Sequence, residues 1–259
     1  MATGNFVIFH MGRCGSTVLQ SQLRASGGVL HDGEAFADLY YLRKEKKPDL
    51  TPQQFLRRRQ RRAARRGLIY GCEIKYPTGT QLDRIGVMRP RAPGYFARLG
   101  FTRFVLLVRT NLLDRLISQA VAVQRGSYTR AAGEQGVLGP VHLPLEGVRF
   151  GANRLSLIET LTLLERETAE MRAVLAAAAP DVLELSYEGD ILGDPNRGAG
   201  KLARHVGLDY VATLPKLEKV VTKPKEDLVE NYHELAACLM PTRFAWMLSR
   251  DAEQEVRHG

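Results

Sequence analysis

Residues 6–17 constrain the fold of this chain more than any other part of the sequence. The first four, FVIF, form a short apolar run of the kind that builds a buried parallel strand. The next eight, HMGRCGST, contain two glycines, and residues 18–24 then repeat apolar side chains at helical spacing. A strand, a glycine-bearing loop and a helix in this order predict the opening of a P-loop βαβ unit.

The rest of the chain alternates between apolar runs and helical patterns. Further strands are predicted at residues 68–76, 101–109 and 182–186. Helices are predicted at 51–66, 111–124, 152–179 and 195–205, and the glycine-containing segment 125–152 is predicted to be a long functional loop. Thr51 is the expected N-cap of the first of these helices and Pro52 its first residue.

This alternation predicts an α/β fold of three layers, α/β/α, with a central, mostly parallel sheet like that of the P-loop NTPases. The sequence contains no internal repeat and no obvious linker. A single domain over residues 1–259 is therefore the simplest prediction.

The chain is basic, with a formal net charge of +9 and a pI near 9.6. Such a charge fits nucleic acid, a membrane surface or a polyanionic small ligand. Seven of the arginines lie in the ten residues 57–66. We interpret this run as a solvated helix face, and an anionic acceptor or membrane headgroups are the functional alternative. Nucleic acid is disfavoured because no helix-turn-helix, zinc-finger or RNA-binding aromatic signature accompanies the run.

The three cysteines are too few and too scattered for a disulfide framework, and no Cys/His cluster suggests a metal site. The N-terminus carries no signal-peptide pattern. No apolar stretch reaches the ~18–20 residues that a membrane span requires. A reduced, cytoplasmic protein without a bound metal is the expectation.

The first loop has the chemistry of an anion site. A loop between a strand and a helix directs backbone N–H groups and the helix dipole at one point. Arg13 adds a permanent charge, and Ser16 and Thr17 add hydroxyls. A nucleoside triphosphate fits poorly, because a Walker A motif has lysine after its second glycine, whereas Gly15 is followed directly by Ser16. A plain strand-to-helix turn with Ser16 as N-cap is the alternative.

At these residues the chain resembles a known family. HMGRCGSTVL resembles the 5′-phosphosulfate loop of the sulfotransferases that use 3′-phosphoadenosine 5′-phosphosulfate (PAPS), in the pattern of bacterial trehalose-type and other carbohydrate sulfotransferases. Arg13, Gly15, Ser16 and Thr17 match the family's pattern. Cys14 replaces the usual serine, which leaves its backbone as the part expected to bind.

Other segments resemble the nucleotide-binding elements of the same family. FVLLVRTNLLDRLISQAVA resembles its 3′-phosphate element, which implies that Arg109 and Ser118 bind that phosphate. Arg109 ends a predicted strand, where open α/β sheets bind ligands. VLELSYEGDILGDP implies that Tyr187 packs near the adenine, and VTKPKEDLVENYHEL implies that Lys223 and Lys225 close over the nucleotide.

The resemblance also implies a general base. In the trehalose-type branch, a segment like Gly33-Glu34-Ala35-Phe36 supplies a glutamate base, so Glu34 is the first candidate. His31 is the second, because the unperturbed pKa of histidine, about 6.5, suits proton transfer near neutral pH. Turn residues without a catalytic role are the alternative.

The resemblance as a whole implies a sulfotransferase with PAPS as donor and 3′-phosphoadenosine 5′-phosphate (PAP) as product. The expected acceptor is a hydroxyl of a small molecule, a carbohydrate or a lipid. Peripheral membrane contact and a homodimer stay open. The alternative function is a P-loop kinase that phosphorylates a small substrate with ATP, and a second alternative is a non-catalytic module that binds anions or nucleic acid.

Overall fold

The computed structural model describes residues 4–37, 50–77, 79–126, 139–150, 153–214 and 223–249, without the side chains of residues 150 and 153. The chain divides into two compact units. Unit 1 comprises Met1–Val108 and Glu167–Leu214, and unit 2 comprises Arg109–Arg166 and Pro215–Gly259. The single domain over residues 1–259 stays a prediction.

Unit 1 is built on a five-stranded sheet in the order β2-β3-β1-β4-β7, in which every described pair of neighbours is parallel. The strands are β1 (Asn5–His10), β2 (Val29–Glu34), β3 (Ile69–Lys75), β4 (Phe101–Val108) and β7 (Val182–Ser186). The predicted fold class is confirmed. The four strands predicted from apolar runs all form, because buried parallel strands are apolar on both faces.

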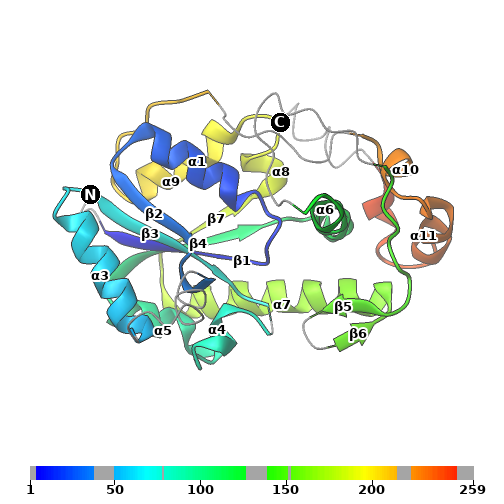
Figure 1. Cartoon of the computed structure of the whole chain (residues 1–259), viewed down its shortest axis with the longest axis horizontal. Helices are drawn as coiled ribbons and strands as arrows, with labels where there is room; N and C mark the ends of the chain where they lie inside the picture. Colours follow the sequence, from blue (N-terminus) through cyan, green and yellow to red (C-terminus); the bar gives the residue numbers. More distant parts are fainter. Residues whose placement is uncertain are drawn as a thin grey trace. The chain divides into compact units, whose positions relative to one another are not determined.

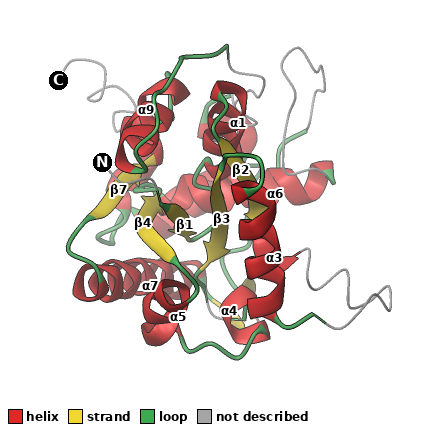
Figure 2. Ribbon diagram, turned by 90° about the vertical axis from the view of Figure 1, so that its left-hand side faces the viewer, coloured by secondary structure: helices red, strands yellow, loops and turns green. Residues whose placement is uncertain are grey.

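Helices cover both faces of this sheet. Figure 1 shows α1 (Ser16–Ser26) and α9 (Pro195–His205) together on one face, with α3 (Pro52–Ala64) and α5 (Ala92–Arg98) on the other. Figure 2 shows the strands between these two helical layers. The connections from β3 to β4 add α4 (Gln81–Arg84) and η1 (Arg89–Arg91), and α8 (Tyr187–Asp190) follows β7 directly. Thr51 caps α3 as predicted, since its side chain accepts from Gln54 N.

Unit 2 contains helices and one hairpin. Its elements are α6 (Leu112–Arg125), β5 (Val148–Phe150), β6 (Asn153–Leu155), the first part of α7 (Leu157–Ala178), α10 (Lys225–Leu228), α11 (Tyr232–Leu239) and η2 (Ala245–Leu248). The prediction of a helix over 152–179 is wrong at its start, because residues 153–155 pair with 148–150. Of the predicted loop 125–152, residues 127–138, 151 and 152 lie outside the described residues.

Strand β2 is the element that the sequence pattern does not predict. Its sequence, VLHDGE, is half polar, yet the Asp32 side chain is only 3% exposed. Asp32 is buried because two partners bind it: Arg59 Nε donates to Oδ2 over 2.5 Å and the Tyr70 hydroxyl donates over 2.9 Å. A buried, hydrogen-bonded carboxylate therefore occupies a position where an apolar residue is expected.

The arginine run lies on and just after α3. Arg59 is the member that turns toward the sheet and binds Asp32. The other six are exposed, as a solvated helix face predicts: Arg57, Arg58, Arg61, Arg62, Arg65 and Arg66. The apolar side of the helix, which includes Phe55 and Leu56, is buried. One arginine thus contributes to the fold of unit 1, and its neighbours contribute charge.

We expect Arg59→Ala to lower the free energy of unfolding by about 2–3 kcal/mol, because it leaves the buried Asp32 carboxylate without its guanidinium partner. Arg58→Ala is the matched control, since Arg58 is exposed, and should change it by less than about 0.5 kcal/mol. Urea unfolding of the three proteins measures both values. Equal effects of the two substitutions would contradict a structural role for Arg59.

Candidate anion-binding and catalytic site

The loop between β1 and α1 has an unusual backbone. Gly12 and Gly15 have φ of 82°, and Arg13 has φ of 58°, which is rare for a residue with a side chain. Gly15 is the N-cap of α1, and no side chain caps this helix. The first N–H groups of α1 are therefore directed at the space in front of the loop, as in an anion site.

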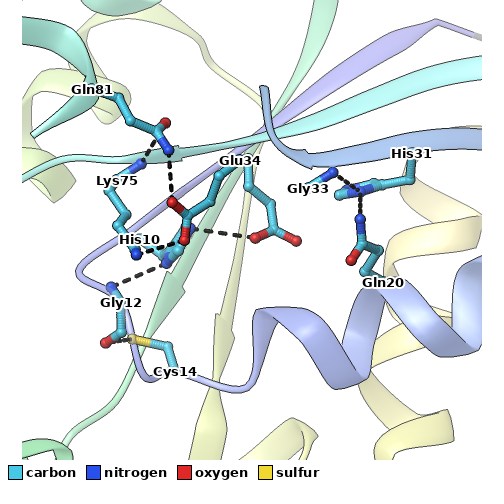
Figure 3. A network of polar contacts seen from close by, with 10 residues as sticks. His10, Gly12, Cys14, Gln20, His31, Gly33, Glu34, Lys75 and Gln81 are labelled. Carbon is cyan, nitrogen blue, oxygen red and sulfur yellow. Dashed lines mark hydrogen bonds and ion pairs between the residues drawn. The ribbon is translucent and has the colours of Figure 1, made fainter. Parts of the chain in front are cut away.

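Cys14 faces the interior of unit 1. Its side chain is fully buried, and Sγ donates to the carbonyl oxygen of Gly12 over 3.2 Å. Figure 3 shows this contact at the bend of the loop. The Cys14 side chain thus contacts the turn from the inner side of the loop. Only the backbone of Cys14 is placed to meet a ligand.

Tyr187 lies against the same loop. A Cβ atom added at Gly15 would come within 2.9 Å of Tyr187 Cδ2 and 3.0 Å of Ile191 Cγ2. Glycine is thus required at position 15 both by its positive φ and by this close packing. Tyr187 and Gly15, two of the predicted nucleotide-binding residues, lie in contact distance.

Glu34 ends β2 at the edge of the sheet from which the loop leaves β1. Its Oε1 lies 2.5 Å from Lys75 Nζ, and its Oε2 accepts from Gln81 Nε2 over 3.0 Å. Figure 3 shows the carboxylate held between these two side chains. About a third of each side chain in the Glu34–Lys75 pair is exposed, at 34% and 35%. Glu34 is therefore a fixed carboxylate that solvent can reach.

His31, the other candidate base, lies inside unit 1. Its side chain is buried, and Nδ1 accepts from Gly33 N over 3.0 Å and lies 2.9 Å from the side-chain amide of Gln20 (Figure 3). Burial, together with the charge of Arg24, lowers the pKa of His31 to about 3. The ring is thus neutral at physiological pH, and its environment is that of a core residue.

A second buried network lies under the loop and was not predicted. His10 Nδ1 accepts from Gly12 N over 3.0 Å, and His10 Nε2 lies 3.5 Å from Glu73 Oε2. Burial raises the pKa of Glu73 to about 7, although a hydrogen bond from the Ser16 hydroxyl acts in the other direction. A single glutamate in an otherwise apolar strand gave no sequence signal for this network.

Unit 2 holds the predicted 3′-phosphate residues. Arg109 is buried, and its Nη2 lies 3.5 Å from Asp114 Oδ2. Ser118 is also buried and lies four residues after Asp114 on α6, so the two share a helix face. The sequence pattern did not indicate Asp114, which forms an ion pair with the Arg109 guanidinium. An acidic residue in the first turn of a helix is too common to be a signal by itself.

The two predicted lysines differ in their surroundings. Lys225 Nζ lies 3.3 Å from Asp114 Oδ1 and donates to the carbonyl oxygens of Met247 and Ser249 over 2.7 and 3.1 Å. Its ammonium group is therefore fixed by unit 2 itself. Lys223 is exposed, so its side chain is accessible to a ligand.

The described residues show neither a metal-binding cluster nor a membrane-spanning helix. They contain no group of three or more His, Cys, Asp or Glu side chains that could hold a metal ion. No helix among them has the length and apolar character needed to cross a membrane.

Comparison with known proteins does not show a family for this chain. No protein-family model matches the chain, and no curated protein matches it in sequence. Among solved structures, a sulfotransferase from Alicyclobacillus acidocaldarius aligns with 100% of this chain and 98% of its own, at 14% identity and a TM-score of 0.44. Similarity at this level is too low to show a common family.

The pKa of His31 predicts a loss of stability in acid. The unfolded chain protonates this histidine near pH 6.5 and the folded chain near pH 3, so its contribution is complete above pH 6.5 and is lost as the pH falls toward 3. At pH 5 this amounts to about 2 kcal/mol. The variant His31→Asn keeps an acceptor near Gly33. When the pH is lowered from 7.5 to 5, its free energy of unfolding should fall by about 2 kcal/mol less than that of the wild type.

Urea unfolding of both proteins at the two pH values measures this difference. Other titrating groups, Glu73 included, are present in both proteins and cancel in the comparison. An equal loss of stability in acid for the two proteins would mean that folding does not lower the pKa of His31.

Proposed function

We propose that this protein transfers the sulfuryl group of PAPS to a hydroxyl acceptor. The observation that carries the proposal is the placement of two features at one edge of the unit 1 sheet. The loop with left-handed Gly12, Arg13 and Gly15 follows β1, and Glu34 ends β2 in contact with Lys75. Transfer to a hydroxyl requires an anion site and a nearby base, and the carboxyl ends of parallel strands supply both.

The loop fits a 5′-phosphosulfate group better than a nucleoside triphosphate. Its backbone supplies an uncapped helix N-terminus, and Arg13 supplies a fork of donors. Cys14 is turned inward, so the loop presents backbone N–H groups at this position. Ser16 follows Gly15 directly, where the lysine of a Walker A motif would stand. This absence makes the kinase the weaker alternative.

PAPS supplies a sulfuryl group whose bridging oxygen leaves with the nucleotide. Glu34 accepts the proton of the acceptor hydroxyl, whose oxygen forms the new bond to sulfur as the bond to the bridging oxygen breaks. Lys75 and Gln81 hold both carboxylate oxygens of Glu34 and so direct the base. Arg13 and the N–H groups of the loop stabilise the charge that develops on the leaving oxygen.

Further roles follow from the resemblance of the sequence. We assign the 3′-phosphate to Arg109 and Ser118, with Asp114 positioning the arginine in unit 2. We assign the adenine to Tyr187, which lies against Gly15 in unit 1. Lys223 is the candidate for closing over the nucleotide, because the ammonium group of Lys225 is bound by Asp114 and two carbonyl oxygens.

The acceptor is proposed only as a class of compound, one that carries a hydroxyl group. A base fixed by a lysine and a glutamine suits a hydroxyl, which must lose its proton during the transfer. Carbohydrate, lipid and other small-molecule hydroxyls all meet this requirement. A panel of such compounds, incubated with PAPS and searched by mass spectrometry for the gain of one sulfuryl group, identifies the acceptor.

With an acceptor from this panel, Glu34→Gln should lower turnover at least ~100-fold, because it removes the general base but keeps the shape of the side chain. Affinity for PAP should change little, since Glu34 lies outside the loop. His31→Asn is the matched control and should retain most of the turnover, because His31 is buried. Unchanged turnover in Glu34→Gln would contradict Glu34 as the base. A loss of turnover in His31→Asn with its fold intact would indicate His31 instead.

A further inference from the structure

Glu73 is a buried carboxyl that the proposed reaction does not use. It lies on β3 opposite Ile8 of β1, and only 3% of the residue is exposed. A buried carboxylate costs free energy unless it is paired and hydrogen-bonded. The partners of Glu73 are His10, at 3.5 Å, and the hydroxyl of Ser16. Both of these residues adjoin the anion loop, one at each end.

His10 connects Glu73 to the start of the loop. Because Nδ1 of His10 accepts the N–H of Gly12, this nitrogen carries no proton. The ring proton therefore sits on Nε2, the atom that faces Glu73. A carboxylate at this place favours that tautomer, which in turn holds the backbone of Gly12. His10 is itself 1% exposed, so the ring lies away from bulk solvent.

Ser16 lies at the other end of the loop and also acts on Glu73. It is the first residue of α1, and its side chain acts on the Glu73 carboxyl, lowering the pKa of that group. An anion bound by the N–H groups at the start of α1 would therefore lie near this carboxyl. Two negative charges so close inside the protein repel each other, and the repulsion is relieved when the carboxyl takes up a proton.

The charges around Glu73 allow such a change. Its pKa is raised to about 7, mainly by burial and also by the negative Glu34, whereas the Ser16 hydroxyl, Lys75 and Arg24 act to lower it. The carboxyl is thus near the midpoint of its titration at neutral pH, where a nearby anion has its largest effect on protonation. The groups that face it are His10 from β1, Ser16 and Arg24 from α1, Glu34 from β2, and Cys72 and Lys75 from β3.

We propose that Glu73 is a positioning residue of the anion loop, acting through His10 and Ser16, and that it takes up one proton from solvent when the loop binds its anion. The proposal rests on the part of the proposed function that makes this loop an anion site. The proton adds to the carboxylate as the anion enters and returns to solvent when the anion leaves. Binding is therefore stronger at lower pH, although Arg13, the cation of the loop, stays charged throughout.

Inorganic sulfate is the probe that tests this coupling, because sulfate itself does not titrate near neutral pH. The dissociation constant for sulfate, from thermal stabilisation of the full chain, should rise on the order of tenfold between pH 6 and pH 8. In Glu73→Gln, which keeps an acceptor for His10, it should not depend on pH. Asp209→Asn removes an exposed carboxylate of unit 1 and should behave like the wild type. The same pH dependence in Glu73→Gln would overturn the proposal.

Calorimetry of the wild-type protein gives a second test that does not depend on the folding of a variant. Titration of sulfate at pH 7, in two buffers of different ionisation enthalpy, should reveal uptake of about half a proton per bound anion. No uptake overturns the proposal. Repeating the titration with PAP separates the two claims: sulfate binding with proton uptake but no PAP binding would leave the role of Glu73 standing and refute PAPS as the donor.

Discussion

The turn of the backbone between β1 and α1 is the constraint on which the candidate site depends. Gly12, Arg13 and Gly15 all have positive φ, and the hydrogen bond from Gly12 N to His10 Nδ1 holds the first of them. This path places the uncapped N-terminus of α1 in front of the loop. Because the described strands of the unit 1 sheet are parallel, the same edge also receives Glu34 from β2 and Lys75 from β3. One turn and one sheet direction thus bring the candidate anion site and a carboxylate to one edge.

The sequence was sufficient for the features that depend on local pattern. Apolar runs predicted four of the five strands, and Thr51 and Pro52 predicted the start of α3. The glycine spacing predicted a tight loop between the first strand and helix, and Gly12 and Gly15 there have positive φ. Glu34 was found through the resemblance of its segment to a known family. The structure adds the ion pair with Lys75, which joins residues 41 positions apart and leaves no local signal.

The remaining features depend on contacts between distant segments. Strand β2 was missed because Asp32 is polar, and its burial makes sense only once Arg59 and Tyr70 are seen to bind it. Glu73 was missed because a single acidic residue in a strand resembles an exposed position until the sheet buries it. Strand β5 was predicted as part of a loop and β6 as part of a helix, since each strand has three residues, too few for a period of two to appear.

The central claim is that the loop binds the 5′ end of PAP in preference to a nucleoside triphosphate, and a ligand titration tests it most directly. Thermal stabilisation of the full chain should be measured with PAP, with ATP and Mg²⁺, and with duplex DNA, for the wild type and for Arg13→Ala. The account predicts stabilisation by PAP that is reduced in Arg13→Ala, with little effect of ATP or DNA. Stabilisation by ATP and Mg²⁺ but not by PAP would contradict it.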